Sequence, residues 1–135
     1  MRRPFITLFG ILGVVVLTAS AALAQGEQDI FDTTVVHDIN LLMNTRDLAD
    51  LHEHFDQNTY YPADFIWRDV RVRNVGIRSR GWGSRNAIKL GLRIDFNRYV
   101  SGQRFAETAA IVLDNLWQDP SMIREAVGMS FIDRM

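Results

Sequence analysis

The alternation of apolar and polar residues predicts several short strands in the middle of the chain. The residues alternate over Val35–Met43 and again over Ile88–Phe96, where every second residue is apolar. A period of two is the pattern of a strand with one buried face. Three further strands are predicted at Asp64–Trp67, at Val70–Arg78 and, as a short buried segment, at Ala109–Leu113.

Two irregularities interrupt this pattern. Arg68 and Asp69 separate two of the predicted strands and are expected to form the turn between them. The apolar phase then slips by one residue between Val72 and Val75. Because such a slip would move side chains to the opposite face of a sheet, it predicts a bulge near Asn74.

The apolar spacing changes to that of a helix in two places. After the first strand, Asn44 or Thr45 can cap a short amphipathic helix whose apolar side is formed by Leu48, Leu51, His52 and Phe55. Near the end of the chain, Asp119 is a good N-cap and Pro120 suits the first helical position. The buried stripe predicted for this second helix is Ile123, Ala126, Val127, Ser130 and Phe131.

These elements predict an α+β fold, a small and mostly antiparallel sheet with two helices that leave one face poorly covered. The second helix continues to Met135 with apolar residues and without a capping residue. Since helices usually end in glycine, asparagine or a polar tail, we expect residues 35–135 to be an incomplete domain.

The N-terminus has the pattern of a secretory signal peptide. Two arginines precede the apolar run Phe5–Leu17, and small residues end at Ala24. An uncleaved membrane anchor is the less favoured alternative because the run is shorter than the ~20 residues of a spanning helix. The sequence therefore predicts a signal peptide at 1–24, a flexible leader at 25–34 and a protein that is secreted, periplasmic or held at the cell surface.

Charge is distributed unevenly although the net charge is only -1. Residues 27–64 are acidic, whereas residues 68–104 are basic and contain Lys89, which is the only lysine. Arginine forms forked contacts with carboxylate or phosphate, so the basic part either pairs with the acidic part or binds anions. The chain has no cysteine, and His52 and His54 are two apart on a helix, so no metal site is predicted.

The stretch RSRGWGSRN places candidate anion-binding groups on flexible backbone. Gly81 and Gly83 permit positive φ and close approach of a ligand, and successive N–H groups in such a turn form an anion nest. Ser84 adds a hydroxyl. Lys89, predicted on the next strand, and Glu125, predicted on a helix, follow in the order of parts found in a kinase N-lobe. The alternative to these kinase roles is that Lys89 is a solvent-facing strand residue and that Glu125 pairs with groups near it in the sequence.

The blocks NVGIRSRGWGSRNAIKLGLRIDF and IVLDNLWQDPSMIREAVG resemble the CotH kinase family, the spore-coat-protein-H-like proteins. The resemblance extends over Val35–Met135. It implies the N-terminal lobe of an atypical secreted kinase that binds ATP with Mg and phosphorylates proteins on Ser or Thr. The partners that it implies are a protein substrate or coat and surface proteins, and not nucleic acid.

The resemblance assigns roles by position. Lys89 matches the basic residue that contacts phosphates, and Glu125 would orient it. The residues implied to bind the nucleotide are Lys89, Glu125, Arg80, Ser84, Arg85 and Arg93. Asn115 and Asp119 match the family's "LDN…DPS" segment, where a capping role is as well founded as a catalytic one.

The resemblance to a kinase is incomplete, because no residue of this sequence matches the family's catalytic aspartate or its metal-binding acids. No catalytic residue is therefore assigned. Two other functions stay open. One is an exported module whose arginine face binds polyanions, and the other is a structural component of a coat or surface.

Overall fold

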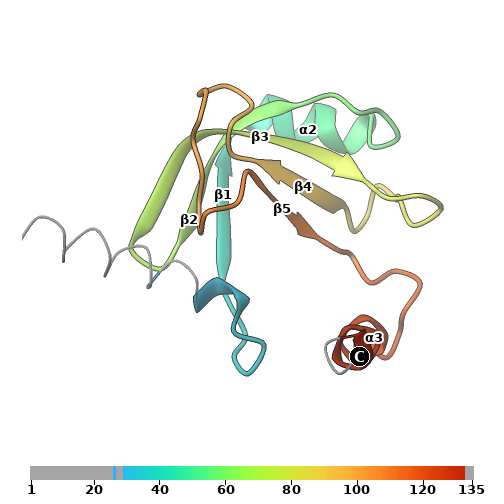
Figure 1. Cartoon of the computed structure of the whole chain (residues 1–135). Helices are drawn as coiled ribbons and strands as arrows, with labels where there is room; N and C mark the ends of the chain where they lie inside the picture. Colours follow the sequence, from blue (N-terminus) through green and yellow to red (C-terminus); the bar gives the residue numbers. More distant parts are fainter. Residues whose placement is uncertain (1–25, 27–28, 133–135) are drawn as a thin grey trace, which may run out of the picture.

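The computed structural model describes Gly26 and residues 29–132, and the predicted signal peptide lies outside the described residues. The described part is a five-stranded sheet in the order β1-β2-β3-β4-β5, in which every neighbouring pair is antiparallel (Figure 1). Helices accompany this open sheet. The predicted α+β class is therefore confirmed. No helix in the described residues is long and apolar enough to cross a membrane.

The order of elements follows the prediction, with shifted ends. The elements are η1 (Asp29–Phe31), β1 (Ile39–Met43), α2 (Thr45–Glu53), β2 (Tyr61–Trp67), β3 (Val70–Arg80), β4 (Gly91–Asp95), β5 (Ala110–Leu113) and α3 (Arg124–Ile132). The first strand begins at Ile39 rather than Val35. The fourth is shorter than predicted, because the segment before Gly91 belongs to a loop.

Local signals correctly predicted α2 and the bulge. The side chain of Asn44 caps α2 by accepting a hydrogen bond from the Arg46 N–H at 2.8 Å. In β3, Asn74 has φ 55° and its N–H donates to the Asp64 carboxylate. The register with β2 shifts at this point. The bulge therefore keeps the apolar residues on both sides of it on one face of the sheet.

The core lies on one face of the sheet. Phe65, Ile77 and Ile94 come from β2, β3 and β4, and Phe105 from the loop before β5 closes over them. The ring centroids of Phe65 and Phe105 are 4.9 Å apart. Leu51 of α2 is also buried in this core. β5, predicted as a buried strand, is only half-buried because it forms one edge of the sheet.

The C-terminal helix differs most from its prediction. α3 begins at Arg124, because Asp119 and Pro120 form a turn instead of the first helical turn. Asp119 still caps it, since its carboxylate accepts from the Arg124 N–H at 2.8 Å. The predicted buried stripe is wrong, because no residue of α3 is buried and Phe131 is 65% exposed. Figure 1 shows α3 standing apart from the sheet. Apolar spacing identifies residues that can be buried, but burial needs a packing partner.

Candidate functional site

The glycine-containing loop, residues 81–90, connects β3 to β4 and has a tightly specified backbone. Gly81 has φ 133° and Gly83 has φ 73°. A Cβ atom on Gly81 would lie 2.5 Å from the Ser84 hydroxyl oxygen, so this turn requires glycine. Trp82 between the two glycines is 98% exposed. The loop thus presents an aromatic side chain to solvent from a conformation that only glycine permits.

Three side chains hold this loop in place: Asn115 from the segment after β5, Asn86 from the loop itself and His52 from α2. The buried Asn115 amide donates to the carbonyl oxygens of Ser84 and Lys89, each at 2.8 Å. Within the loop, the Asn86 side chain accepts from the Lys89 N–H at 2.7 Å. The His52 Nδ1 of α2 donates to the Ala87 carbonyl at 2.7 Å and so connects α2 to the loop. These contacts fix the loop at its middle and at its end.

Ser84 and Glu125, two of the predicted residues, line one polar hollow of about 260 Å³. Asp114 also lines it, and its carboxylate lies 3.8 Å from the guanidinium of Arg80, a third predicted residue. The rest of the lining is Leu116, Gln118, Asp119 and Arg124. Donors and acceptors are thus mixed in this hollow, as expected for a site that binds a polar ligand.

Asp119 has a structural role at this hollow. The Ser121 hydroxyl donates to its carboxylate, and so do the backbone N–H groups of Ser121 and Arg124. These hydrogen bonds, the Ser121 hydroxyl first, hold the pKa of Asp119 below its ordinary value. Of the two roles left open by the sequence, the geometry supports capping.

The structure corrects the position of Lys89. This residue lies in the loop and not on a strand, because its N–H and that of Ile88 are bonded to the Asn86 side chain. Its exposed side chain borders an apolar groove of about 440 Å³ between the loop, α2 and the end of β1, lined among others by Leu48 and Leu51. Within residues 29–132 the ammonium group of Lys89 has no hydrogen bond or ion pair.

Lys89 and Glu125 consequently line different hollows, and no salt bridge joins them in the described structure. The expected pair is therefore not formed in this arrangement of α3. Lys89 and Arg93 both fall within the strand predicted at Ile88–Phe96, but only Arg93 lies on β4.

The remaining two predicted residues are engaged elsewhere. Arg85 donates to the Asp56 carbonyl and to the Asn58 side chain, and so ties the loop to the segment after α2. Arg93 lies on β4, with its guanidinium 3.6 Å from the Asp95 carboxylate. Arg85 therefore acts as a structural brace, and Arg93 belongs to a different surface from Ser84 and Lys89.

Three contributors were missed in the sequence. Asp114 and Gln118 line the hollow, and His52 supports the loop. Asp114 and Gln118 could have been found from the sequence, because both lie within a few residues of Asn115, which matches the family's "LDN…DPS" segment. Nothing in the sequence indicates the contact of His52, which joins residues 35 positions apart.

Comparison with known proteins supports the family resemblance for part of the chain. The model of the family described as CotH kinase protein matches residues 77–135. This segment contains the end of β3, the whole glycine-containing loop and α3, so the resemblance is confirmed there. Residues 35–76 lie outside the match. No significant match was found among curated proteins or among solved structures. The likeness of the sheet to a kinase N-lobe therefore rests on sequence.

Proposed function

We propose that residues 77–135 contribute the phosphate-binding part of a secreted CotH-like protein Ser/Thr kinase. The main support is that one amide, Asn115, holds the backbone at both Ser84 and Lys89. A hydroxyl and an unpaired ammonium group are thus carried by the same braced loop. A loop already held in one shape loses little conformational entropy when it binds a ligand.

Each group has a distinct task in this proposal. The Ser84 hydroxyl and the N–H groups near Gly81 and Gly83 donate to phosphate oxygens, as in other anion nests. Lys89 neutralises phosphate charge. Glu125 orients Lys89 after a movement of α3 toward the loop, which is needed because the two side chains line separate hollows. An unpacked α3 can make such a movement without breaking a core.

The metal that the family implies does not fit the residues described. No group of three or more His, Asp or Glu side chains is placed to hold a metal ion in that part of the chain. At the hollow, Asp114 is paired with Arg80 and Asp119 is occupied as a cap. No catalytic residue is therefore assigned among the described residues. Export remains part of the proposal, supported by the signal-peptide pattern of residues 1–24.

The proposal predicts that the chain binds ATP through Lys89. Calorimetric titration with ATP should show binding, with adenosine much weaker. Lys89→Ala should weaken ATP binding roughly tenfold to a hundredfold, because a charged hydrogen bond contributes about 1.5–3 kcal/mol. Lys89→Arg should retain part of the affinity.

Arg46→Ala is the matched control, since Arg46 is exposed on α2 and its side chain has no partner in the described structure. Unchanged ATP affinity in Lys89→Ala, or affinity for adenosine equal to that for ATP, would contradict the proposal.

A further inference from the structure

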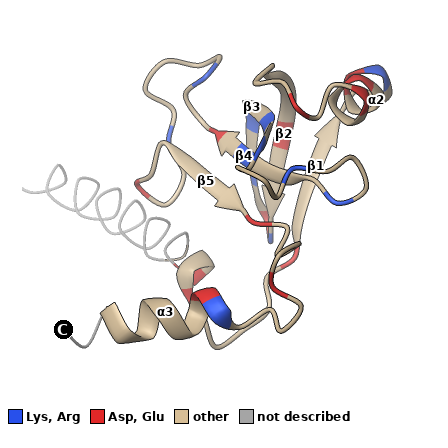
Figure 2. Ribbon diagram, turned by 90° about the vertical axis from the view of Figure 1, so that its right-hand side faces the viewer, with Lys and Arg blue, Asp and Glu red and all other residues tan. Residues whose placement is uncertain are grey.

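Two arginines face each other on the polar side of the sheet. Arg78 of β3 and Arg93 of β4 are direct partners in the antiparallel register. Residues in such positions lie on the same face with their Cβ atoms about 5 Å apart, and like charges there are unfavourable. Figure 2 shows basic positions on β3 and beside β4. This pair therefore costs stability unless a negative charge compensates it.

Asp95, the acidic residue beside Arg93, only partly compensates the positive charge of this pair. The Asp95 carboxylate lies 3.6 Å from the Arg93 guanidinium, longer than a hydrogen bond. The same oxygen accepts the Tyr60 hydroxyl at 3.3 Å. The other carboxylate oxygen of Asp95 is buried and has no hydrogen-bond partner among the described residues. One carboxylate thus faces the two arginines.

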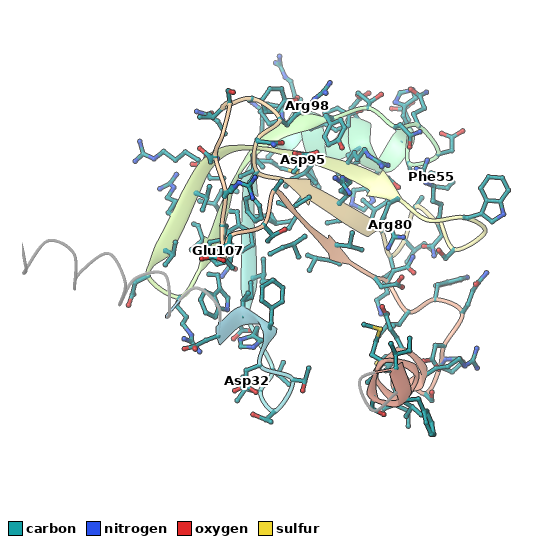
Figure 3. The ribbon with its side chains drawn as sticks, viewed as in Figure 1. Asp32, Phe55, Arg80, Asp95, Arg98 and Glu107 are labelled. Atoms are coloured by element: carbon teal, nitrogen blue, oxygen red, sulfur yellow. The ribbon has the colours of Figure 1, made fainter. Side chains whose placement is uncertain are left out.

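A third arginine, Arg98, lies close to this pair in the loop that follows β4. The guanidinium carbon of Arg98 lies 4.6 Å from the centroid of the Tyr60 ring, and that of Arg78 lies at 5.5 Å. The stem of Arg98 passes over Gly76, where a Cβ atom would be only 2.6 Å from it. Figure 3 shows Arg98 and Asp95 on this side of the molecule. Tyr60 and Gly76 therefore position the Arg98 guanidinium in advance of any ligand.

Most donors of the cluster are unused. The Arg98 guanidinium has no hydrogen bond or ion pair to any residue in 29–132, and Arg78 donates from Nη1 only, to the Asn58 side chain and the Ser79 carbonyl. Among the described residues, the one ion pair that these three arginines make is that of Arg93 with Asp95. Forked guanidinium donors match the oxygen atoms of phosphate, and an anion with two or more charges would offset the excess.

We propose that Arg78, Arg93 and Arg98, arranged around Tyr60, form a binding site for a multiply charged phosphate-type anion. The site does not include Ser84 or Lys89 and does not depend on nucleotide binding there, although Arg85 of the glycine-containing loop shares the Asn58 and Ser79 acceptors of Arg78. The anion can be a free polyphosphate or the phosphate groups of a surface polymer, which share the chemistry that the arginines recognise. Such a site would give an exported protein a means of attachment to phosphate-bearing material.

Calorimetric titration of the chain with inorganic pyrophosphate tests the proposal. Binding is expected to weaken at least tenfold in Arg98→Gln and in Arg93→Gln, and to fall as salt is raised. Arg46→Gln is the control, because it removes one exposed charge away from the cluster. Unfolding temperatures of the free variants check that each is folded, and pyrophosphate should raise that temperature less in Arg98→Gln than in the wild type.

A glycerol phosphate oligomer in place of pyrophosphate distinguishes the source of the anion. Binding of both probes indicates a polymer ligand, and binding of pyrophosphate alone indicates a small one. In a Lys89→Ala background, which disables the proposed nucleotide site, pyrophosphate should still bind and Arg98→Gln should still weaken that binding at least tenfold, which separates the two sites. Equal pyrophosphate affinity in Arg98→Gln and Arg46→Gln, or no binding by the wild type, would overturn the proposal.

Discussion

Asn115 is the residue on which the shape of the glycine-containing loop most depends, and its replacement by alanine tests this directly. The substitution removes two hydrogen bonds, from the side-chain amide to the Ser84 and Lys89 carbonyls, each 2.8 Å long. It also removes the acceptor of the Trp117 N–H at 3.2 Å. The Asn115 side chain is buried, so water replaces these contacts poorly.

The expected loss follows from these contacts. An intramolecular hydrogen bond contributes about 1 kcal/mol net, and the two short bonds of Asn115 together about 2 kcal/mol. A small domain has a urea dependence of roughly 1–3 kcal/mol per molar. The midpoint of urea unfolding, followed by circular dichroism, should therefore fall by on the order of 1 M in Asn115→Ala.

A second variant and a local measurement make the test specific. Asn115→Asp keeps the shape and the acceptor for Trp117, but it sets a carboxylate oxygen against two carbonyl oxygens, so its loss should be at least as large. Hydrogen exchange of the Lys89 amide should speed up in both variants. The exposed Asn97, whose side chain has no hydrogen bond in the described structure, is the control as Asn97→Ala. If both Asn115 variants unfold at the same urea concentration as Asn97→Ala, Asn115 does not hold the loop.

Two further predictions concern the sheet. Gly76→Ala should lower the unfolding free energy by about 1–3 kcal/mol in thermal or urea denaturation, because its Cβ would lie 2.6 Å from the Arg98 side chain. Gly128→Ala, which has open space, should not lower it. Hydrogen bonds, first from the Arg71 guanidinium, hold the pKa of Asp64 below its ordinary value. The unfolded state therefore takes up the proton first as the pH falls, so this stabilisation is complete above about pH 4 and is lost below it. Asp64→Asn should flatten the fall in unfolding free energy between about pH 5 and pH 2, and an unchanged slope would contradict this assignment.

The sequence was informative wherever a structural feature depends on neighbours in the chain. The presence and order of the five strands, a cap of α2 at Asn44 or Thr45 and the phase slip near Asn74 all concern residues a few positions apart, and the structure agrees with each. Ser84 and Glu125, which the resemblance assigns to nucleotide binding, line one hollow. They line the same hollow because the segment that leads from β5 to α3 is hydrogen-bonded to the loop, through Asn115 and the Ser84 carbonyl.

The errors concern features that depend on distant partners. α3 has an apolar stripe, but nothing in the described structure covers Val127 or Phe131. Lys89 continues the alternation of β4, yet its carbonyl oxygen accepts a hydrogen bond from the Asn115 amide, 26 positions away, and the residue belongs to the loop. In both cases the periodic signal was present, and a tertiary contact, or its absence, decided the outcome.

The sequence by itself determined the α+β class, the glycine-containing loop and the resemblance of residues 77–135 to the CotH kinase family, because each follows from residue type and spacing along the chain. Only the tertiary structure decided the roles of the arginines. Arg85 is used as an internal brace, whereas Arg98 presents an unpaired guanidinium over Tyr60. These roles differ because the strand register and the paths of the loops determine which groups lie near each guanidinium. Neither can be deduced from the residues immediately before and after an arginine in the sequence.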